Sequence, residues 1–236
     1  MTAPAEFVAL GGGMRGYLAL PEGGESAPGV LVFQEAFGVN DYVQSEVRRL
    51  AAHGYAALAP DLFDGMTYGY GERESVFARL QTLRDVDMLK YVDAALVFLE
   101  GHAAVKRGRF GTVGFCMGGR LAFLTATARP ARIGAAASFY GGGIAPEQKR
   151  FFDPLVDRVT ALQGALLLIY GADDEGISPR EHGRLAEALS AHKKDYTLHV
   201  FPGAGHGFAS TDRESYRPVQ AEQAWTETLA LFARTL

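Results

Sequence analysis

Several features that would point to particular classes of protein are missing from this sequence. Among its 236 residues there is one cysteine, so no intramolecular disulfide bond can form. No block of basic residues is present and the formal net charge is −4, which gives little support to binding of nucleic acid or an anionic membrane. Apolar runs such as residues 165–170 are far too short to cross a bilayer, and the N-terminus lacks the pattern of a signal peptide. We therefore expect a cytoplasmic protein without nucleic-acid or membrane partners.

The amino acids that are present are typical of a soluble globular α/β protein. Apolar residues make up 48% of the chain, enough to cover both faces of a central sheet. No linker or internal repeat interrupts the chain, so we expect a single domain over residues 1–236. Short, nearly continuous apolar segments bounded by turn residues predict buried strands. These segments lie at 29–33, 55–59, 109–114, 133–139, 165–170 and 196–201.

Helical patterns alternate with these strands. Apolar stripes and capping residues predict helices at 41–52, 85–100, 180–189 and 220–236. The repeated β-α-β order predicts an α/β fold with a mostly parallel central sheet, right-handed crossovers and helices on both faces. Two earlier segments, 6–10 and 14–20, flank three glycines and predict an antiparallel hairpin at one edge of the sheet.

Cys116 lies in the segment Gly-Phe-Cys-Met-Gly, between an apolar strand pattern and a helical pattern. Glycines two positions before and after a residue permit a sharp strand-to-helix turn that exposes its side chain. The start of the helix favours a thiolate, and the N–H of Met117 is the natural donor to an oxyanion. The pattern predicts a nucleophile, whereas a free cysteine taken alone is as often a small buried apolar residue.

A thiol nucleophile needs a base and a third group that orients the base. Where a fold of this architecture carries a nucleophile at such a turn, an acid and then a histidine follow along the chain. His206 lies in a glycine-rich loop directly after the last predicted strand and is the predicted base. The loop after the preceding strand offers three carboxylates, those of Asp173, Asp174 and Glu175, and we expect the acid among them.

From about residue 29 to the final helix, the sequence resembles the dienelactone hydrolase family of α/β hydrolases. The most specific matches are Gln-Glu-Ala-Phe-Gly-Val-Asn at 34–40, Gly-Phe-Cys-Met-Gly-Gly at 114–119 and Ala-Gly-His at 204–206. Cysteine in place of the serine usual in α/β hydrolases is especially diagnostic. The resemblance implies the α/β-hydrolase fold and the opening of a small ester or lactone by a Cys-His-Asp triad, through a thioacyl-enzyme intermediate.

The resemblance also implies roles for individual residues. The family acid stands three residues after the glycine that ends its strand, here Gly171, and this spacing selects Asp174 over Asp173. Glu35 occupies the place of a glutamate that contacts the cysteine, moves when substrate binds and helps to generate the thiolate. The backbone N–H of Ala36 corresponds to the family's second oxyanion donor.

Substrate recognition is where the sequence departs from the family pattern. Members that act on dienelactone bind its carboxylate with two arginines and a tyrosine. Arg73 occupies one arginine position, but the tyrosine position holds Phe77 and the second arginine position holds Ser210. Arg213 is close enough in sequence to replace the missing arginine, and Phe37 is a further candidate for substrate contact. These departures argue against dienelactone itself, but not against hydrolysis of an ester or lactone.

We expect no cofactor and no bound metal, a small ester or lactone as the binding partner, and a monomer or weak homodimer. Other interpretations of the sequence are a thiol esterase for a different small ester, a non-catalytic scaffold that binds a small molecule, and a redox role for Cys116. Residues 63–75, rich in glycine and tyrosine, form either a mobile lid or an ordered loop.

Overall fold

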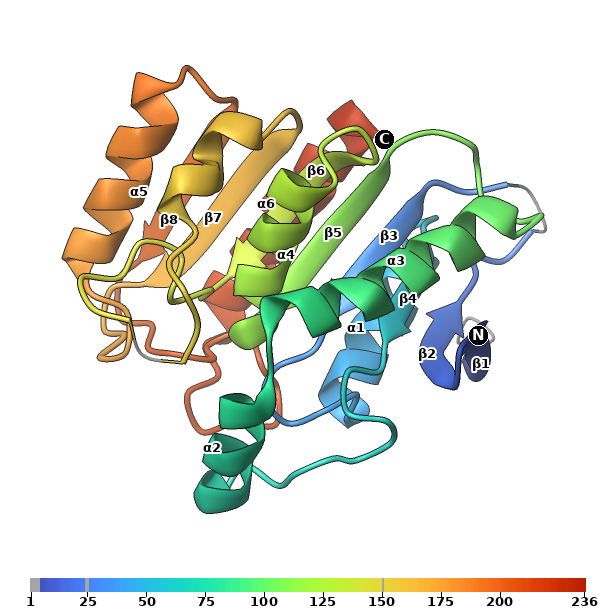
Figure 1. Cartoon of the computed structure of the whole chain (residues 1–236), viewed down its shortest axis with the longest axis horizontal. Helices are drawn as coiled ribbons and strands as arrows, with labels where there is room; N and C mark the ends of the chain where they lie inside the picture. Colours follow the sequence, from blue (N-terminus) through green and yellow to red (C-terminus); the bar gives the residue numbers. More distant parts are fainter. Residues whose placement is uncertain (1–4, 24–25, 150) are drawn as a thin grey trace.

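The fold is built on one eight-stranded sheet, seen in a computed structural model that describes residues 5–23, 26–149 and 151–236 (Figure 1). The strand order is β1-β2-β4-β3-β5-β6-β7-β8. Strands β3 to β8 run parallel to one another, whereas β2 pairs antiparallel with β1 and β4. The bounds are β1 (Ala5–Gly11), β2 (Met14–Ala19), β3 (Gly29–Phe33), β4 (Ala56–Pro60), β5 (Phe110–Phe115), β6 (Ile133–Phe139), β7 (Ala165–Gly171) and β8 (Tyr196–Phe201). The predicted parallel sheet with an antiparallel hairpin at its edge is confirmed.

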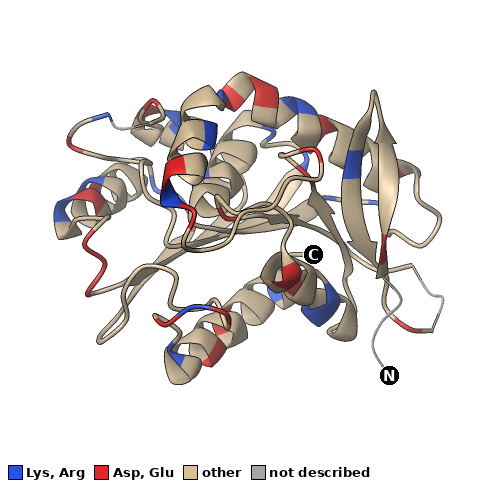
Figure 2. Cartoon of the chain, turned by 90° about the horizontal axis from the view of Figure 1, so that it is seen from below, with Lys and Arg blue, Asp and Glu red and all other residues tan. Residues whose placement is uncertain are grey.

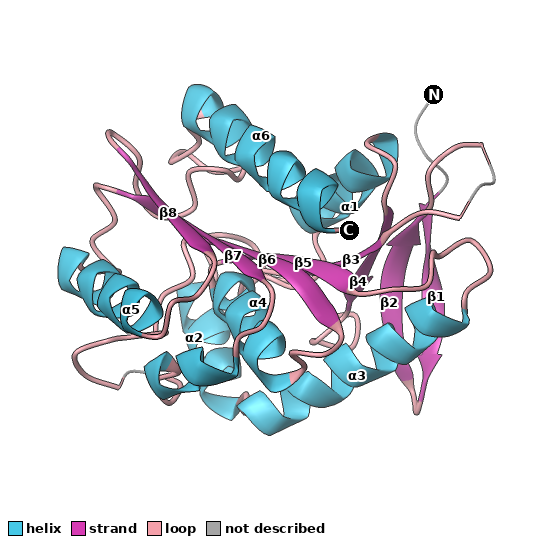
Figure 3. Ribbon diagram, turned by 90° about the horizontal axis from the view of Figure 1, so that it is seen from above, coloured by secondary structure: helices cyan, strands magenta, loops and turns pink. Residues whose placement is uncertain are grey.

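Helices cover both faces of the sheet. Figure 3 shows α1 and α6 on one face and α3, α4 and α5 on the other. The bounds are α1 (Asp41–Ala52), α2 (Arg73–Thr82), α3 (Asp85–Gly101), α4 (Met117–Ala128), α5 (Pro179–Ala191) and α6 (Pro218–Thr235), with a 3₁₀ helix, η1, at Val156–Ala161. The strands and helices with predicted bounds agree with these to within two residues at each end.

Helix α2 is a correction to the predicted element order, which has no helix between residues 52 and 85. Little in the sequence indicates this helix. Of its ten residues, all within the described part of the chain, Val76 alone is buried, so there is no apolar stripe, and no side chain caps the first turn. Figure 1 shows α2 beyond the end of the sheet at which α4 begins. The loop before α2 is tied down by backbone hydrogen bonds, including one of 3.0 Å from Tyr68 N–H to the carbonyl of Phe37.

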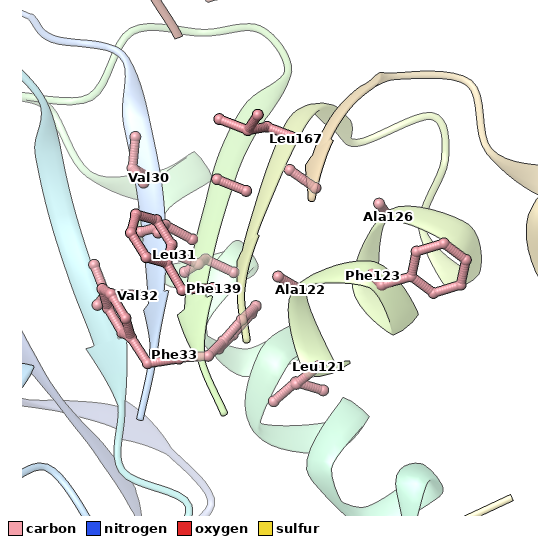
Figure 4. Close-up of a cluster of buried hydrophobic side chains, with 14 of the residues drawn as sticks. Val30, Leu31, Val32, Phe33, Leu121, Ala122, Phe123, Ala126, Phe139 and Leu167 are labelled. Carbon is pink, nitrogen blue, oxygen red and sulfur yellow. The ribbon is translucent and has the colours of Figure 1, made fainter. Parts of the chain in front are cut away.

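The core lies between the sheet and its helices. All five residues of β3 and all seven of β6 are buried, as expected for parallel strands covered on both faces. Figure 4 shows side chains from β3, β6, β7 and α4 gathered in one cluster. Burial of one large aliphatic or aromatic side chain contributes about 1.5–3 kcal/mol, so this cluster fixes α4 firmly on the sheet.

The surface shows no separation of charge by sign along the helices. Figure 2 shows acidic and basic positions interspersed, in keeping with the mixed charge of the sequence. Within the described ranges, none of the helices has the length and hydropathy that a membrane span needs. The carboxyl ends of β3 and β5 to β8 lie at one edge of the sheet, so the loops that follow these strands meet there.

Candidate active site

The turn at Cys116 has a strained backbone. The residue joins β5 to α4 with φ 55° and ψ −117°, a region that L-residues rarely occupy and that often marks a functional position. Its N–H donates to the carbonyl of Phe139, at the end of β6, over 3.0 Å. This bond and the burial of the first turn of α4 hold the strained conformation in place.

The glycines around Cys116 are required by close backbone packing. A Cβ atom on Gly118 would overlap the carbonyl oxygens of Phe33 and Gln34, and one on Gly114 would overlap the carbonyl of Gly118. The start of α4 can therefore approach the loop after β3 only because these positions lack side chains. The glycine spacing in the sequence reflects this contact.

His206 and Asp174 come from the loops after β8 and β7 and meet beside Cys116. Nδ1 of His206 lies 2.7 Å from Oδ2 of Asp174, whose side chain is fully buried. The other carboxylate oxygen of Asp174 accepts a hydrogen bond of 2.8 Å from the N–H of Gly176. The two loops are joined by a 2.9 Å bond from Asp173 N–H to the carbonyl of Ala204. Asp174, rather than Asp173, is the carboxylate that holds the ring.

The protonation of His206 depends on its neighbours. Burial by itself lowers the pKa of His206, but the interactions of the ring with Cys116 and with the Asp174 carboxylate outweigh burial and raise the pKa to about 10. The arrangement therefore favours the cationic form of the His206 ring. About a third of the His206 side chain is exposed, so this pair can be reached from solvent.

Glu35 lies buried in the loop after β3 and is paired with Arg213. Nη1 of Arg213 lies 3.3 Å from Oε1 of Glu35, while Oε2 has no hydrogen-bond partner among the described residues. Burial raises the pKa of Glu35, and the charges of Arg213 and His206 act in the opposite direction. Among the described residues, no hydrogen bond joins Glu35 to Cys116.

Two backbone donors flank this group of side chains. Met117 is the first residue of α4, and Ala36 follows Glu35 in the loop after β3. In the described ranges, neither of their N–H groups donates to a protein acceptor. The close packing of Gly118 on this loop brings the two backbone segments together, as oxyanion binding requires.

A cavity of about 520 Å³ opens next to the candidate site. Its lining includes Cys116 and His206 together with apolar side chains from several elements, and the other charged side chains in its described lining are carboxylates. The apolar members are Phe77, Leu80, Met117, Pro146, Phe151, Phe152 and Ile177, and the carboxylates are Asp173, Asp174, Glu175 and Glu181. A cavity of this size can hold a small organic molecule.

The four candidate substrate residues lie in different places. Phe77, on α2, is half exposed and lines the cavity. Arg73 is exposed at the first residue of α2 and is absent from the lining. Phe37 packs on Tyr70, with ring centroids 4.6 Å apart, and the hydroxyl of Ser210 lies 3.0 Å from the Tyr70 hydroxyl. Neither Phe37 nor Ser210 lines the cavity, so direct contact of substrate with them stays a prediction.

Sequence reasoning missed two buried charges that hold the cavity wall. Arg120, on α4, binds Asp85 through two hydrogen bonds of 2.6 and 3.0 Å and donates to the carbonyls of Gly143 and Asp153. Glu181, on α5, accepts bonds of 2.9 and 3.1 Å from the backbone N–H groups of residues 144 and 145. Both side chains fix the loop at residues 141–155. The sequence did contain one indication of the role of Arg120, because a charged residue directly after the Gly-Gly of the turn is expected to be buried with its helix.

Comparison with known proteins agrees with this geometry. The model of the dienelactone hydrolase family matches residues 14–236. A Synechocystis protein named as a carboxymethylenebutenolidase is 31% identical over 94% of this chain and 92% of its own. A Bradyrhizobium protein named as a 2-oxo-3-(5-oxofuran-2-ylidene)propanoate lactonase is 34% identical, over 90% of this chain and 86% of its own.

Solved structures of the same family are similar to this chain. A dienelactone hydrolase from Klebsiella pneumoniae, 29% identical, superposes with a TM-score of 0.90 over 99% of both chains. A dienelactone hydrolase-like promiscuous phosphotriesterase from metagenomic libraries, 25% identical, gives a TM-score of 0.83 over 100% of this chain and 99% of its own. The sheet order, the turn at Cys116 and these matches lead to one conclusion. The chain belongs to the dienelactone hydrolase family and has the α/β-hydrolase fold.

Proposed function

We propose that the chain is a single catalytic domain that opens a small ester or lactone with Cys116 as nucleophile, His206 as base and acid, and Asp174 as the group that orients His206. The observation that carries the proposal is the 2.7 Å bond between His206 and a fully buried Asp174, next to a cysteine with a strained backbone. A carboxylate in this position fixes the tautomer of the ring and stabilises its cationic form.

In the first half of the reaction, the Cys116 thiolate attacks the carbonyl carbon and a carbon–sulfur bond forms. The carbonyl oxygen becomes an oxyanion that accepts hydrogen bonds from the N–H groups of Met117 and Ala36; loss of one such donor typically slows a reaction about 10²–10³-fold. The carbon–oxygen bond to the leaving group then breaks, and the leaving oxygen takes a proton from His206. The product of this half is a thioester on Cys116.

In the second half of the reaction, His206 acts as a base instead of an acid. Neutral His206 takes a proton from water as the water oxygen attacks the thioester carbon, and the carbon–sulfur bond then breaks. This releases the acid and restores the thiolate next to an imidazolium ring. A thiolate suits activated leaving groups such as enolates, because it must be the poorer leaving group in the first half. Enol esters and enol lactones are therefore favoured over amides.

Glu35 contributes to the charge state of the nucleophile in this proposal. Its buried carboxylate with one unpartnered oxygen supports a side chain that can change partner when substrate enters. Pairing with Arg213 keeps it off Cys116 in the free protein, and its movement toward the thiol would help to generate the thiolate.

The experiment compares wild type with Cys116→Ala, using p-nitrophenyl acetate and a cis-dienelactone as substrates. We expect Cys116→Ala to abolish hydrolysis of both, and wild type to gain the mass of one acetyl group early in the p-nitrophenyl acetate reaction. His206→Ala should lose activity as well, whereas His192→Ala, at an exposed position, should not. Undiminished hydrolysis by Cys116→Ala would disprove the assignment, and ligand binding without turnover by wild type would support a non-catalytic scaffold.

A further inference from the structure

The cavity beside Cys116 differs from a site built to bind a carboxylate. Given the function proposed above, we infer that the physiological substrate of this site carries an uncharged, apolar substituent, and that the 520 Å³ cavity holds it. The class of substrate is then an uncharged aryl or alkyl ester or lactone. Three features support this class: the apolar lining of the cavity, the sign of its charges and the pairing of the nearby arginines.

The wall of the cavity is aromatic and aliphatic. Phe77 and Phe151 contact each other with centroids 5.5 Å apart, and Phe152, Ile177 and Met117 complete an apolar surface. Phe77 is 50% exposed, although it is a large aromatic side chain. Such a ring, half exposed at an apolar cavity, is a surface that an apolar ligand would cover.

Apart from the His206 ring of the candidate site, the charged side chains in the described part of the lining are carboxylates. Asp173 and Glu175 are exposed carboxylates, Glu181 is a buried one, and Asp174 is engaged by His206. Among the residues that the structure describes, none that lines the cavity is lysine or arginine. A substrate carboxylate in this space would be repelled and would lose its hydration, and the His206 cation is already engaged by Asp174.

In the described part of the chain, Arg120 and Arg213 lie near the site, and both are already paired. Arg120 has its guanidinium 4.6 Å from the centre of the Phe152 ring and is bound by Asp85 and two backbone carbonyls. Arg213 is paired with Glu35 and, like Arg120, does not line the cavity. Each arginine therefore has its charge balanced by a carboxylate of the protein.

The test uses two pairs of esters that differ by a carboxylate. On the acyl side, p-nitrophenyl hexanoate is compared with mono-p-nitrophenyl adipate, in which a carboxylate replaces the terminal methyl group. On the alcohol side, 4-acetylphenyl acetate is compared with 4-carboxyphenyl acetate. In at least one pair we expect kcat/KM of wild type to be about tenfold or more higher for the uncharged ester, with all turnover lost in Cys116→Ala.

A charge placed in the cavity should reverse this preference. Phe77→Arg adds a cation to the lining at a half-exposed position, so the fold should tolerate it. Ala78→Arg adds the same charge to the next residue of α2, which is exposed and outside the lining. In the ester pair for which wild type prefers the uncharged ester, we expect Phe77→Arg to reduce the ratio of the two kcat/KM values at least about fivefold. Ala78→Arg should leave this ratio unchanged. Because each ester is compared with itself across variants, differences in intrinsic reactivity cancel.

The outcomes separate this inference from the proposed function. The proposed function would be overturned if wild type hydrolysed none of the esters faster than Cys116→Ala does. Cys116-dependent hydrolysis in which the carboxylate esters are equal or better in both pairs would leave the proposed function intact and overturn the inference. The inference also fails if the preference responds equally to Phe77→Arg and Ala78→Arg, because the selectivity would then not arise in the cavity.

Discussion

The turn that carries Cys116 and the wall of the cavity beside it are held in different ways. At the turn, the backbone of α4 packs directly against the backbone that follows β3, and no side chain intervenes at Gly114 or Gly118. At the wall, the buried side chains of Arg120 and Glu181 bind carbonyl and N–H groups of the loop at residues 141–155. A backbone contact tolerates no added atom, whereas a loop held by side chains can shift. Changes at the turn should therefore act on folding and chemistry, and changes at the wall mainly on selectivity.

The largest effect is expected at the backbone contact of the turn. In Gly118→Ala the new Cβ overlaps the backbone carbonyls of Phe33, the last residue of β3, and of Gln34, which follows it. We expect a loss of at least about 3–5 kcal/mol in the free energy of unfolding, or no folded protein.

The control for this prediction is Gly183→Ala, the same substitution in helix α5. An added Cβ at Gly183 meets nothing within 4 Å, and the site is exposed. Alanine should stabilise the helix there by about 0.5–1 kcal/mol. Urea unfolding monitored by circular dichroism measures both variants. A Gly118→Ala protein of wild-type stability would contradict the packing argument.

The second effect concerns the acid of the site. Asp174→Asn keeps the shape of the side chain but removes the charge that orients His206, so kcat should fall by about 10²–10⁴-fold while the fold is retained. Asp173→Asn changes the neighbouring exposed carboxylate, which holds no histidine, and should reduce kcat less than about fivefold. Stopped-flow measurement of p-nitrophenyl acetate hydrolysis compares the two variants, and equal losses would contradict the role of Asp174.

The turn was predictable from sequence because its requirements are local. Glycines at fixed distances from Cys116 reflect steric contacts that only those positions make. The strands were predictable for a similar reason, since each buried strand is a continuous apolar run. The choice of Asp174 over Asp173, in contrast, depended on family spacing, because both carboxylates lie in one loop and their different burial follows from packing.

Apart from Phe77, which the family position identified, the cavity wall was not predictable, because its parts come from distant loops. Phe77 on α2, Phe152 before η1 and Ile177 before α5 meet only in the folded chain. Arg213 likewise reaches Glu35 across 178 positions of sequence. Helix α2 lacks the apolar stripe that identifies other helices. Such contacts have no periodic signature in a single sequence.

The third prediction tests the charges behind the wall. Arg120→Met removes a buried partner of Asp85 and two bonds to the loop at 141–155, so we expect a loss of about 2–4 kcal/mol in the free energy of unfolding. We expect KM for p-nitrophenyl hexanoate to rise more than KM for the acetate, because an acetyl group is too short to depend on the wall.

Arg129→Met is the matched control for this variant. Arg129 also pairs with a carboxylate on α3, that of Asp93, but both side chains of this pair are partly exposed. The stability loss should be about 0–1 kcal/mol, with no change in the ratio of the two KM values. If Arg120→Met and Arg129→Met alter stability and the KM ratio equally, Arg120 has no special role in the wall.

The smallest effect is a change in one pKa. In Cys116→Ala the interaction with sulfur that favours the cationic ring of His206 is lost, while burial, which lowers the pKa of His206, stays. The pKa of His206 should therefore fall below its value of about 10, so that the ring loses its proton at a lower pH than in wild type. Nitrogen NMR of the imidazole ring across a pH titration measures this directly. Asp174→Asn should also lower the pKa, because it weakens the remaining bond that favours the cation. An unchanged His206 titration in Cys116→Ala would mean that the ring is not paired with a thiolate, and the turn would then present a neutral thiol.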